Sequence, residues 1–554
     1  MEQTQTKPLP EPFKDWPNDA AKHTQYFAGQ FETTAEQREP IELPVIGSFP
    51  LHVAGVLYRT GPASYKLVPQ SSGSCKVLYN SRRQVDALIE EVRKTGSLRG
   101  MTFGQKRDPC ANFFQKVKAV FETHFETTNP EMVNVGVTVH ANVPGIPSHL
   151  KVPSRQHGQG GFARLTTLTD ANLIKHIDPE TLEPLGVTRQ AGLHPALKGP
   201  LSSAHAELDP LTGDLYNYNL AFGRHATYRV FRTSAATGKT ETLATITGPG
   251  VQAAYLHSFF LSRDYVILCV WPALFVAGGV KVLWERNLLD AMRFDPETPT
   301  RWYVVDRKAG RGVVATFASP AFFSFHTINA WQTDDADGEE EGPRDGTTDI
   351  ICDLIQYPTD KMLHRVYYES LVSTGPKVEK YSGSDRSRPR LVRYRLSGIP
   401  STGHRQGTGK EYGKKDRPYA TWPQATAELT IASDAVGDLS TINPRFTGRK
   451  TRFVYNFCTQ GKSSFFDGIA KVDVDTQEST IWSRDRHTPG EAIFVPEPGA
   501  EAEDAGFLLS VVLNGDTGMS YLLCLDARTM TEVARAECEA AVGCGFHGSH
   551  YPAK

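Results

Sequence analysis

The sequence predicts an all-β fold, and a β-propeller in preference to a β-sandwich. Hairpin-like units recur from about residue 170 to 535, with few helical stretches among them. They include "HIDPETLEPLGV", "ELDPLTGDLYNYN", "FRTSAATGKTETLA", "KVDVDTQESTIW" and "CLDARTMTEVARAE". Each unit joins two β-rich runs through Asp or a small polar residue and a short Pro, Thr or Gly turn, which is the chemistry of tight turns. Repetition over this length favours a propeller, although the repeat is too degenerate to count blades.

Composition supports a large globular protein and excludes several functions. The chain has 554 residues, of which 39% are hydrophobic and 10% aromatic, enough for a sizeable core. Its net charge is −2, from 60 basic and 62 acidic residues, so it lacks the electrostatic footprint of a nucleic-acid-binding protein.

Eight cysteines without a C-x-x-C pair indicate a cytosolic protein rather than a disulfide framework. The polar, Pro-rich start predicts no signal peptide, and no apolar run reaches the ~18 residues of a spanning helix. We therefore expect a cytoplasmic location.

Along the chain, we expect residues 1–40 to form an N-terminal extension and residues 41–554 a single propeller domain. Two insertions break the β pattern, at 98–125 and 271–294, and both are predicted to be amphipathic helical segments that cap one face. Each segment packs on the propeller or dips into a bilayer, as basic amphipathic segments do. In the second case, the membrane would be contacted by Phe113, Phe114, Leu274, Phe275 and Val276.

Four of the 17 histidines differ from the rest, because each leads into or out of a β-rich run beside small or aromatic residues. They are His205 in "LSSAHAELDP", His257 in "AAYLHSFFLSRDYVIL", His326 in "AFFSFHTINAW" and His547 in "GCGFHGSHY". A single core histidine is usually a satisfied hydrogen-bonding group, but four spread along the chain suit an axial site of a propeller. Imidazole is a ligand for iron, copper and zinc, and four neutral ligands leave the metal its charge and room for a further ligand. The neighbouring His550 is expected to be incidental.

At these histidines the sequence resembles the carotenoid cleavage oxygenases. The matching motifs run in order along most of the chain, and they include "GVLYRTGPASYKL", "MTFGQKRDPCANFFQKV", "HAELDPLTGDLYNY", "YLHSFFLSRDYVIL", "FFSFHTINAW" and the terminal "GFHG". The resemblance implies a seven-bladed propeller in which His205, His257, His326 and His547 hold a non-haem Fe²⁺ on the axis. It also implies cleavage of a C=C bond by O₂ to give two aldehydes, without an organic cofactor. The substrate would be an apolar polyene, taken from a membrane or lipid-droplet surface by peripheral binding.

The resemblance further implies three carboxylates, each hydrogen-bonded to one ligand imidazole. The matching positions are Asp170 for His257, Asp438 for His326 and Glu491 for His547. A carboxylate on the outer ring nitrogen fixes the tautomer of the ligand and raises its basicity. Two of the three are Asp where the family has Glu, so we expect a closer strand or a bridging water to offset the shorter side chain.

The sequence also departs from the family. After "YRTGPASYKL" the family has a strand pair with a "WFDG"-type motif, whereas here the chain continues at once into "VPQSSGSCKVLYNSRRQ". Either the first blade has lost a part or the natural chain has a further segment after Lys66. We favour the second, because a lost hairpin would expose unpaired edges.

Two other functions stay open at this point. A stilbene-cleaving oxygenase would share the fold and the iron, but the lysine that anchors a phenol in that branch has no clear counterpart here, and "KRDPCANFFQKV" matches the carotenoid-cleaving branch better. A catalytically inactive propeller that binds lipids is the other alternative, and iron content separates it from an enzyme. The sequence looks most like fungal members that cut torulene, β-carotene or apocarotenals.

Overall fold

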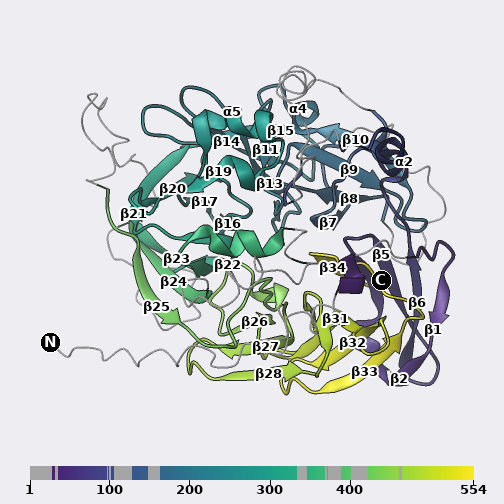
Figure 1. Cartoon of the computed structure of the whole chain (residues 1–554). Helices are drawn as coiled ribbons and strands as arrows, with labels where there is room; N and C mark the ends of the chain where they lie inside the picture. The colour runs from purple at the N-terminus through teal and green to yellow at the C-terminus, as the bar shows by residue number, and fades with distance from the viewer. Residues whose placement is uncertain are drawn as a thin grey trace, which may run out of the picture.

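Seven antiparallel sheets stand around one central axis as the blades of a β-propeller (Figure 1). The computed structural model describes residues 28–31, 35–96, 98, 102–104, 128–146, 162–333, 346–367, 371, 388–400, 422–460 and 465–553. The predicted propeller is thereby confirmed.

The strands of each blade follow one another in sequence, except in the two blades where the ring closes. The closing blade contains β34 (Gly548–Pro552), β4 (Gly55–Arg59), β5 (Ala63–Pro69) and β6 (Ser74–Ser81), with β1 (Ile41–Leu43) and β3 (Phe49–Pro50) on β6. The next blade contains β7 (Thr138–Ala141), β8 (Leu165–Leu168), β9 (Leu173–Ile177) and β10 (Pro184–Arg189). It is followed by the blade of β11 (Leu201–Ser202), β12 (Glu207–Leu208), β13 (Leu215–Ala221), β14 (Thr227–Thr233) and β15 (Thr240–Ile246).

The remaining four blades complete the circle. One contains β16 (Phe260–Leu261), β17 (Tyr265–Val270), β20 (Thr300–Asp306) and β21 (Val313–Ser319). The next contains β22 (Phe323–Gln332), β23 (Thr347–Tyr357), β24 (Arg390–Pro400) and β25 (Thr426–Ile431). The following one contains β26 (Phe453–Cys458), β27 (Gly468–Asp473) and β28 (Ser479–Ser483). The last contains β29 (His487–Pro489), β30 (Ile493–Pro496), β31 (Gly506–Asn514), β32 (Met519–Asp526), β33 (Glu532–Glu537) and β2 (Val45–Gly47).

Short helices lie between the strands. They are η1 (Ala28–Phe31), η2 (Leu51–Val53), α2 (Asp86–Thr95), η3 (Pro130–Met132), α4 (Gln190–Leu193), η7 (Asp360–Val366) and η10 (Pro444–Phe446). Within the described residues, no helix combines the length and the hydropathy needed to cross a bilayer.

The recurring turn of the sequence is built by its Asp side chains. Asp178 Oδ1 accepts hydrogen bonds from the backbone amides of residues 180 and 181 at 2.8 and 2.9 Å. Asp209, Asp473 and Asp526 hold the amides two and three residues ahead in the same way. An Asp side chain that caps its own turn fixes the reversal between two strands. The repeated Asp therefore marks the turn between two neighbouring strands of one sheet in four different blades.

The ring is closed by two pairings between the ends of the chain. β34 pairs with β4, so the strand nearest the C-terminus is an inner strand of the first blade. β1 pairs with β6 of that blade, and β2 pairs with β33 of the last blade. Closure of this kind removes the exposed edges that an open sheet would present.

The shortened segment after Lys66 does not leave a gap in the closing blade. β4 and β5 are joined by the tight connection at residues 60–62, and they pair from Gly55↔Leu67 to Arg59↔Ala63. β5 then pairs along its whole length with β6. The expectation that a chain without this strand pair would expose unpaired edges is therefore wrong, because β4, β5 and β6 form a complete antiparallel run.

The predicted helical segment 271–294 is a mixture of strands and short helices. β18 (Ala273–Phe275) pairs with β19 (Met292–Phe294), and between them lie η5 (Val276–Gly279), α5 (Val280–Glu285) and η6 (Leu289–Ala291). The backbone φ angles of Gly278 and Gly279 are 60° and 95°, which interrupts a right-handed helix. Most of the other predicted cap segment, 98–125, lies outside the described residues, including Phe113 and Phe114.

Candidate metal centre

Four histidines meet inside the propeller. They are His205, His257, His326 and His547, and one ligand atom from each lies within 4.8 Å of all the others. Three of them are buried, and His205 is half-buried. The structure thus brings together all four residues selected from the sequence, although 342 positions separate the first from the last.

The inner strands of four blades explain this convergence. His205 lies two residues before β12, His257 lies three residues before β16, His326 is within β22, and His547 directly precedes β34. Inner strands of a propeller all face the central channel. Side chains at the entry of each strand therefore point to the same place on the axis.

His547 is fixed although it lies close to the end of the chain. The amide of Thr60 donates to the His547 carbonyl at 2.9 Å, and the His547 amide donates to the Thr60 hydroxyl at 3.1 Å. Terminal residues fray unless such contacts hold them. His550 lies outside the cluster, and its Nε2 contacts the carbonyl oxygen of Val53 at 3.1 Å, so its role is to fasten the strand.

Serines beside the histidines join neighbouring strands at the site. Ser203 Oγ donates to the His257 carbonyl at 2.6 Å and accepts from the His205 amide at 3.1 Å. Ser258 Oγ donates to the carbonyl that precedes His326 and accepts from the amide that follows it, each at 2.9 Å. Sequence reasoning missed these serines, and the signal for them was their position one or two residues from a ligand.

A carboxylate contacts the Nδ1 atom of three of the four histidines. The pairs are His257 with Asp170 at 2.9 Å, His326 with Asp438 at 2.6 Å, and His547 with Glu491 at 2.8 Å. A hydrogen bond at Nδ1 fixes the tautomer, so that Nε2 keeps its lone pair for a metal. In the described part of the chain, no carboxylate contacts His205 in this way.

Both Asp side chains reach their histidines directly, at 2.9 and 2.6 Å, so no bridging water is needed to offset their shorter length. Each is also held by a tyrosine that sequence reasoning missed. Tyr255 Oη donates to Asp170 Oδ2 at 2.9 Å, and Tyr357 Oη donates to Asp438 Oδ2 at 2.7 Å. Burial and the neighbouring carboxylate raise the pKa of each tyrosine well above its usual value, so the hydroxyls stay protonated as donors.

Glu491 is held differently. Its Oε2 accepts from the amide of Gly548 at 2.8 Å and lies 3.4 Å from Nη1 of Arg59, whose side chain is buried. Arg59 Nη2 also donates to the carbonyl of Gly545 at 2.6 Å. The same arginine therefore connects the carboxylate to the segment that carries His547.

Burial favours the neutral imidazole at two of the four histidines, His205 and His547. Burial, with the neighbouring histidines, lowers the pKa of His205 well below its usual value, and burial also lowers the pKa of His547. Burial opposes ionisation of Asp438, but His326 and the hydrogen bonds from Tyr357 and the Leu439 amide bring its pKa below the usual value.

Two buried nitrogens of the cluster have no hydrogen-bond partner among the residues that the structure describes. They are Nε2 of His205 and Nε2 of His326. Buried polar atoms are rarely left unpaired, and each such atom calls for an explanation. Four convergent imidazoles, three of them backed by carboxylates, fit a divalent transition metal.

Aromatic side chains stand beside the cluster. The Phe325 ring lies edge-on to His257 with centroids 5.1 Å apart, and Phe103 lies 6.2 Å from Phe325 and 5.7 Å from Tyr255. Such a wall offers apolar contact and no hydrogen bond to a molecule that lies next to the metal centre.

Of the residues predicted to contact a membrane, the structure describes Leu274, Phe275 and Val276, and these three differ in exposure. Phe275 is 5% exposed, and its ring packs edge-on against Phe222, so it belongs to the core and the prediction for this residue is wrong. Leu274 is half-buried against the same core. Val276 is 37% exposed, and the neighbouring Val280, which was not predicted, is 63% exposed.

Comparison with known proteins agrees with this geometry. A family model described as retinal pigment epithelial membrane protein matches residues 30–552. The torulene dioxygenase of Gibberella fujikuroi is 40% identical over 586 residues, which cover 98% of this chain and 95% of the relative. The carotenoid dioxygenase of Neurospora crassa is 38% identical over 587 residues, which cover 98% and 92%. The 586 aligned positions exceed the 554 residues of this chain, so the torulene dioxygenase has residues at positions where this chain has none.

Solved structures are similar in fold. A variant of Synechocystis apocarotenoid oxygenase has a TM-score of 0.67 and 21% identity, and the match covers 95% of this chain and 98% of that one. A cobalt-substituted form of the Synechocystis enzyme has a TM-score of 0.66 and 20% identity with the same coverage. At this identity the comparison establishes the propeller fold.

Proposed function

The chain belongs to the carotenoid oxygenase family of the retinal pigment epithelial membrane protein, and on this basis we propose that it is a carotenoid cleavage dioxygenase. It cleaves one C=C bond of a carotenoid or apocarotenoid with O₂ to give two carbonyl products. The observation that carries this conclusion is the set of four converging histidines with carboxylates on three of them. Torulene is the first substrate to test, because a relative that is 40% identical is a torulene dioxygenase.

The metal that we propose is Fe²⁺, held by His205, His257, His326 and His547. When bound, the iron supplies the activation of O₂ that cleavage of a C=C bond requires. The protein contributes four neutral ligands, and a four-ligand set leaves open positions at a metal that prefers a higher coordination number. Asp170, Asp438 and Glu491 keep three of the imidazoles oriented, and they add negative charge that stabilises a cation in a buried site.

The protein's own side chains also select the substrate class. A polyene has almost no polar group, so its binding free energy comes from burial of apolar surface, at about 25 cal/mol per Å². The aromatic wall of Phe103, Tyr255 and Phe325 supplies that surface beside the metal centre. The Tyr255 hydroxyl is already bonded to Asp170, so it does not present a free donor to a phenolic substrate.

Turnover of a substrate panel by purified, iron-loaded protein tests the function. Torulene, β-carotene and apocarotenals are offered beside resveratrol, and the carbonyl products are identified by mass. We expect aldehydes from at least one carotenoid or apocarotenoid, with loss of turnover in His326→Ala. His487→Ala is the matched control, because His487 is buried against Tyr521 outside the site. Faster turnover of resveratrol than of every carotenoid, or no aldehyde from any of them, would overturn the proposal.

We also propose that the chain works in the cytoplasm and binds reversibly to a membrane or lipid-droplet surface, from which it takes its substrate. The exposed Val276 and Val280 support this, since they project from the inserted segment between β17 and β20. The seven described cysteines are all free, as in a cytosolic protein.

Flotation with phosphatidylcholine vesicles tests the membrane contact. We expect wild type to float and a Val276→Ser/Val280→Ser variant to float less. Ile46→Ser is the control, because Ile46 is 53% exposed but lies on β2, the outermost strand of the last blade. Equal flotation of all three proteins would exclude this surface.

A further inference from the structure

A second site lies on the face of the propeller opposite the histidines. It is a cavity of about 900 Å³ whose lining includes the residues at the far ends of three inner strands: Asp209 after β12, Arg263 after β16, and Gln332 at the end of β22. Asp209 is four residues beyond His205. At a rise of about 3.3 Å per residue, this places the cavity roughly 13 Å or more from the histidine cluster along the strands. It is therefore separate from the metal centre.

The lining of the cavity is strongly basic. The cationic residues are Arg263, Arg307, Lys308, Arg445, Arg449, Lys450 and Arg452, and the carboxylates are Asp209, Asp475 and Glu503. Seven cations against three carboxylates leave an excess of four positive charges in a protein whose net charge is −2. Such an excess makes the electrostatic potential inside the cavity positive, which favours an anionic ligand.

Part of this charge is neutralised within the protein. Arg307 forms a buried ion pair with Asp209. Arg452 pairs with Asp473 at 2.7 Å, outside the lining. Glu503 accepts hydrogen bonds from the backbone amides of residues 452 and 453, at 2.9 and 2.8 Å. Asp209 is thus already paired with a cation, and Glu503 is held by backbone amides and not by one of the other cations.

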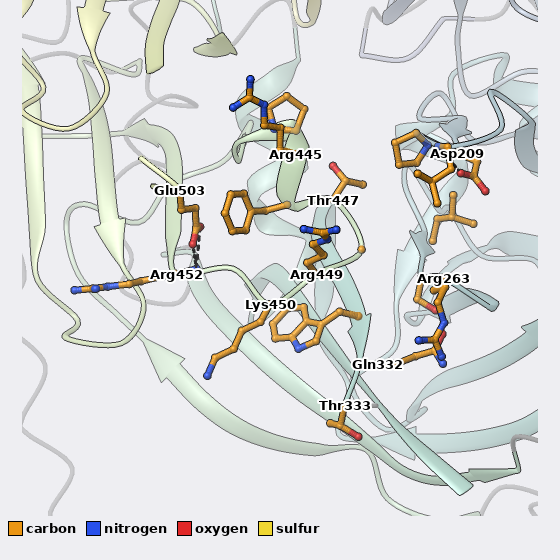
Figure 2. A pocket seen from close by; sticks show the side chains of 18 of the residues that line it. Asp209, Arg263, Gln332, Thr333, Arg445, Thr447, Arg449, Lys450, Arg452 and Glu503 are labelled. Carbon is orange, nitrogen blue, oxygen red and sulfur yellow. Dashed lines mark hydrogen bonds between the residues drawn. The ribbon is translucent and has the colours of Figure 1, made fainter. Parts of the chain in front are cut away.

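Arg263 pairs with Asp264 at 2.9 Å, and four lining cations remain without an acidic partner among the described residues. The side chains of Lys308, Arg449 and Lys450 have no hydrogen bond or ion pair there, and Arg445 donates only to the carbonyl of Ala500, at 3.0 Å. Figure 2 shows the segment with Arg445, Thr447, Arg449 and Lys450 on one side of the cavity, and Asp209, Arg263 and Gln332 across from it.

The loop that carries Arg445, Arg449 and Lys450 is held in place by a side chain of β22. Asn329 of β22 is 5% exposed, and its Nδ2 donates to the carbonyls of Phe446 and Arg449 at 3.2 and 2.7 Å. Its Oδ1 accepts from the amide of Gly448 at 2.9 Å. A buried amide that uses its donors and its acceptor on one loop fixes the loop before any ligand arrives, which lowers the entropic cost of binding.

We propose that this cavity binds a ligand with two or more clustered phosphate groups. Arginine matches the geometry of phosphate oxygens with paired N–H donors, and lysine adds point charge. Four cations without an acidic partner suit a dense multivalent anion, and a volume of about 900 Å³ exceeds what a single phosphate fills. Phe446 and Trp331 on the wall offer apolar contact to an organic part of the ligand.

Two sources supply this chemistry, a soluble polyphosphorylated compound and the headgroup of a phosphorylated lipid. Inorganic tripolyphosphate is the probe for the first source, with binding measured by titration calorimetry at physiological salt. We expect saturable binding that becomes at least about tenfold weaker in Arg449→Gln/Lys450→Gln, since two charge-assisted contacts are lost. The control is Arg93→Gln/Lys94→Gln, which changes the same residue pair on the exposed helix α2.

Vesicle sedimentation tests the second source. The amount of protein that sediments with phosphatidylcholine vesicles is compared with the amount that sediments with the same vesicles containing a phosphatidylinositol bisphosphate. Binding to phosphatidylcholine through the opposite face is equal in both measurements and is removed by subtraction. Saturable binding in either arm that Arg449→Gln/Lys450→Gln weakens and Arg93→Gln/Lys94→Gln leaves unchanged supports the site, and the arm identifies the source. No saturable binding in either arm, or an equal loss in the control variant, would overturn the proposal. Unchanged thermal unfolding and iron content of both variants show that each is folded.

Discussion

Replacing Asp438 by Asn removes one negative charge behind a metal ligand and changes its shape very little. Asp438 is 2% exposed and accepts from His326 at 2.6 Å, from Tyr357 at 2.7 Å and from the Leu439 amide at 2.9 Å. An amide keeps one acceptor oxygen for His326 but loses the charge that raises the basicity of the ring. Loss of such a partner weakens metal binding by about 10- to 100-fold, or about 1.4–2.7 kcal/mol. Because one hydrogen bond is retained, we expect a value near tenfold.

Competition with a chelator measures this effect. Iron-loaded protein is dialysed against increasing chelator, and the iron retained per chain is determined by elemental analysis. Asp353→Asn is the matched control, since Asp353 is fully buried in β23, in the blade that carries His326, but bonds to Arg393, at 2.9 and 2.8 Å, and not to a ligand. We expect the control to unfold at a lower temperature and to keep its iron. Wild-type iron affinity in Asp438→Asn, or an equal loss in Asp353→Asn, would refute the reasoning.

Three further predictions concern the metal ligand His326, the carboxylate of Glu491 and two buried histidines. His326→Ala should abolish stoichiometric iron binding, measured by elemental analysis, whereas His487→Ala should retain it, and equal iron in both variants would remove His326 from the ligand set. Glu491→Gln should weaken iron retention by about 10- to 100-fold, less than the loss of a ligand, and no change would remove it from the site. Burial lowers the pKa of His176 to about 3 and of His550 to about 4, so the unfolded state binds more protons than the folded state between pH 4 and about 6.5. The urea midpoint should therefore fall as the pH drops through this window, and a constant midpoint would contradict that assignment.

The sequence carried most of the information on strands and ligands, because both depend on local chemistry. An Asp that caps its own turn is visible as a residue type at a fixed place, and Asp178 and Asp526 behave as predicted. His205 and His257 were recognisable from the small and aromatic residues around them. The turn at each Asp and the recognition of each histidine depend on a few neighbouring residues along the chain.

Contacts between distant blades were less accessible to sequence reasoning. Tyr357 meets Asp438 across 81 positions, and neither residue type indicates the other. The segment 271–294 has the apolar content of an amphipathic helix, but its pairing of β18 with β19 depends on glycines in left-handed conformations and on packing against the propeller. Tertiary contacts there override the helical spacing of its side chains. Phe275 was assigned to the surface for the same reason.

The pairing of His547 with Thr60 also has a consequence for biosynthesis. These two residues are 487 positions apart, so a ribosome that adds about 5–20 residues per second needs roughly 25 to 100 s between them. During that time β4 has no partner on its inner side, and the nascent chain has at most three of its four histidine ligands. Metallation and closure of the ring therefore become one event after translation of β34, and the open edge of β4 is the surface that a chaperone would have to shield until then.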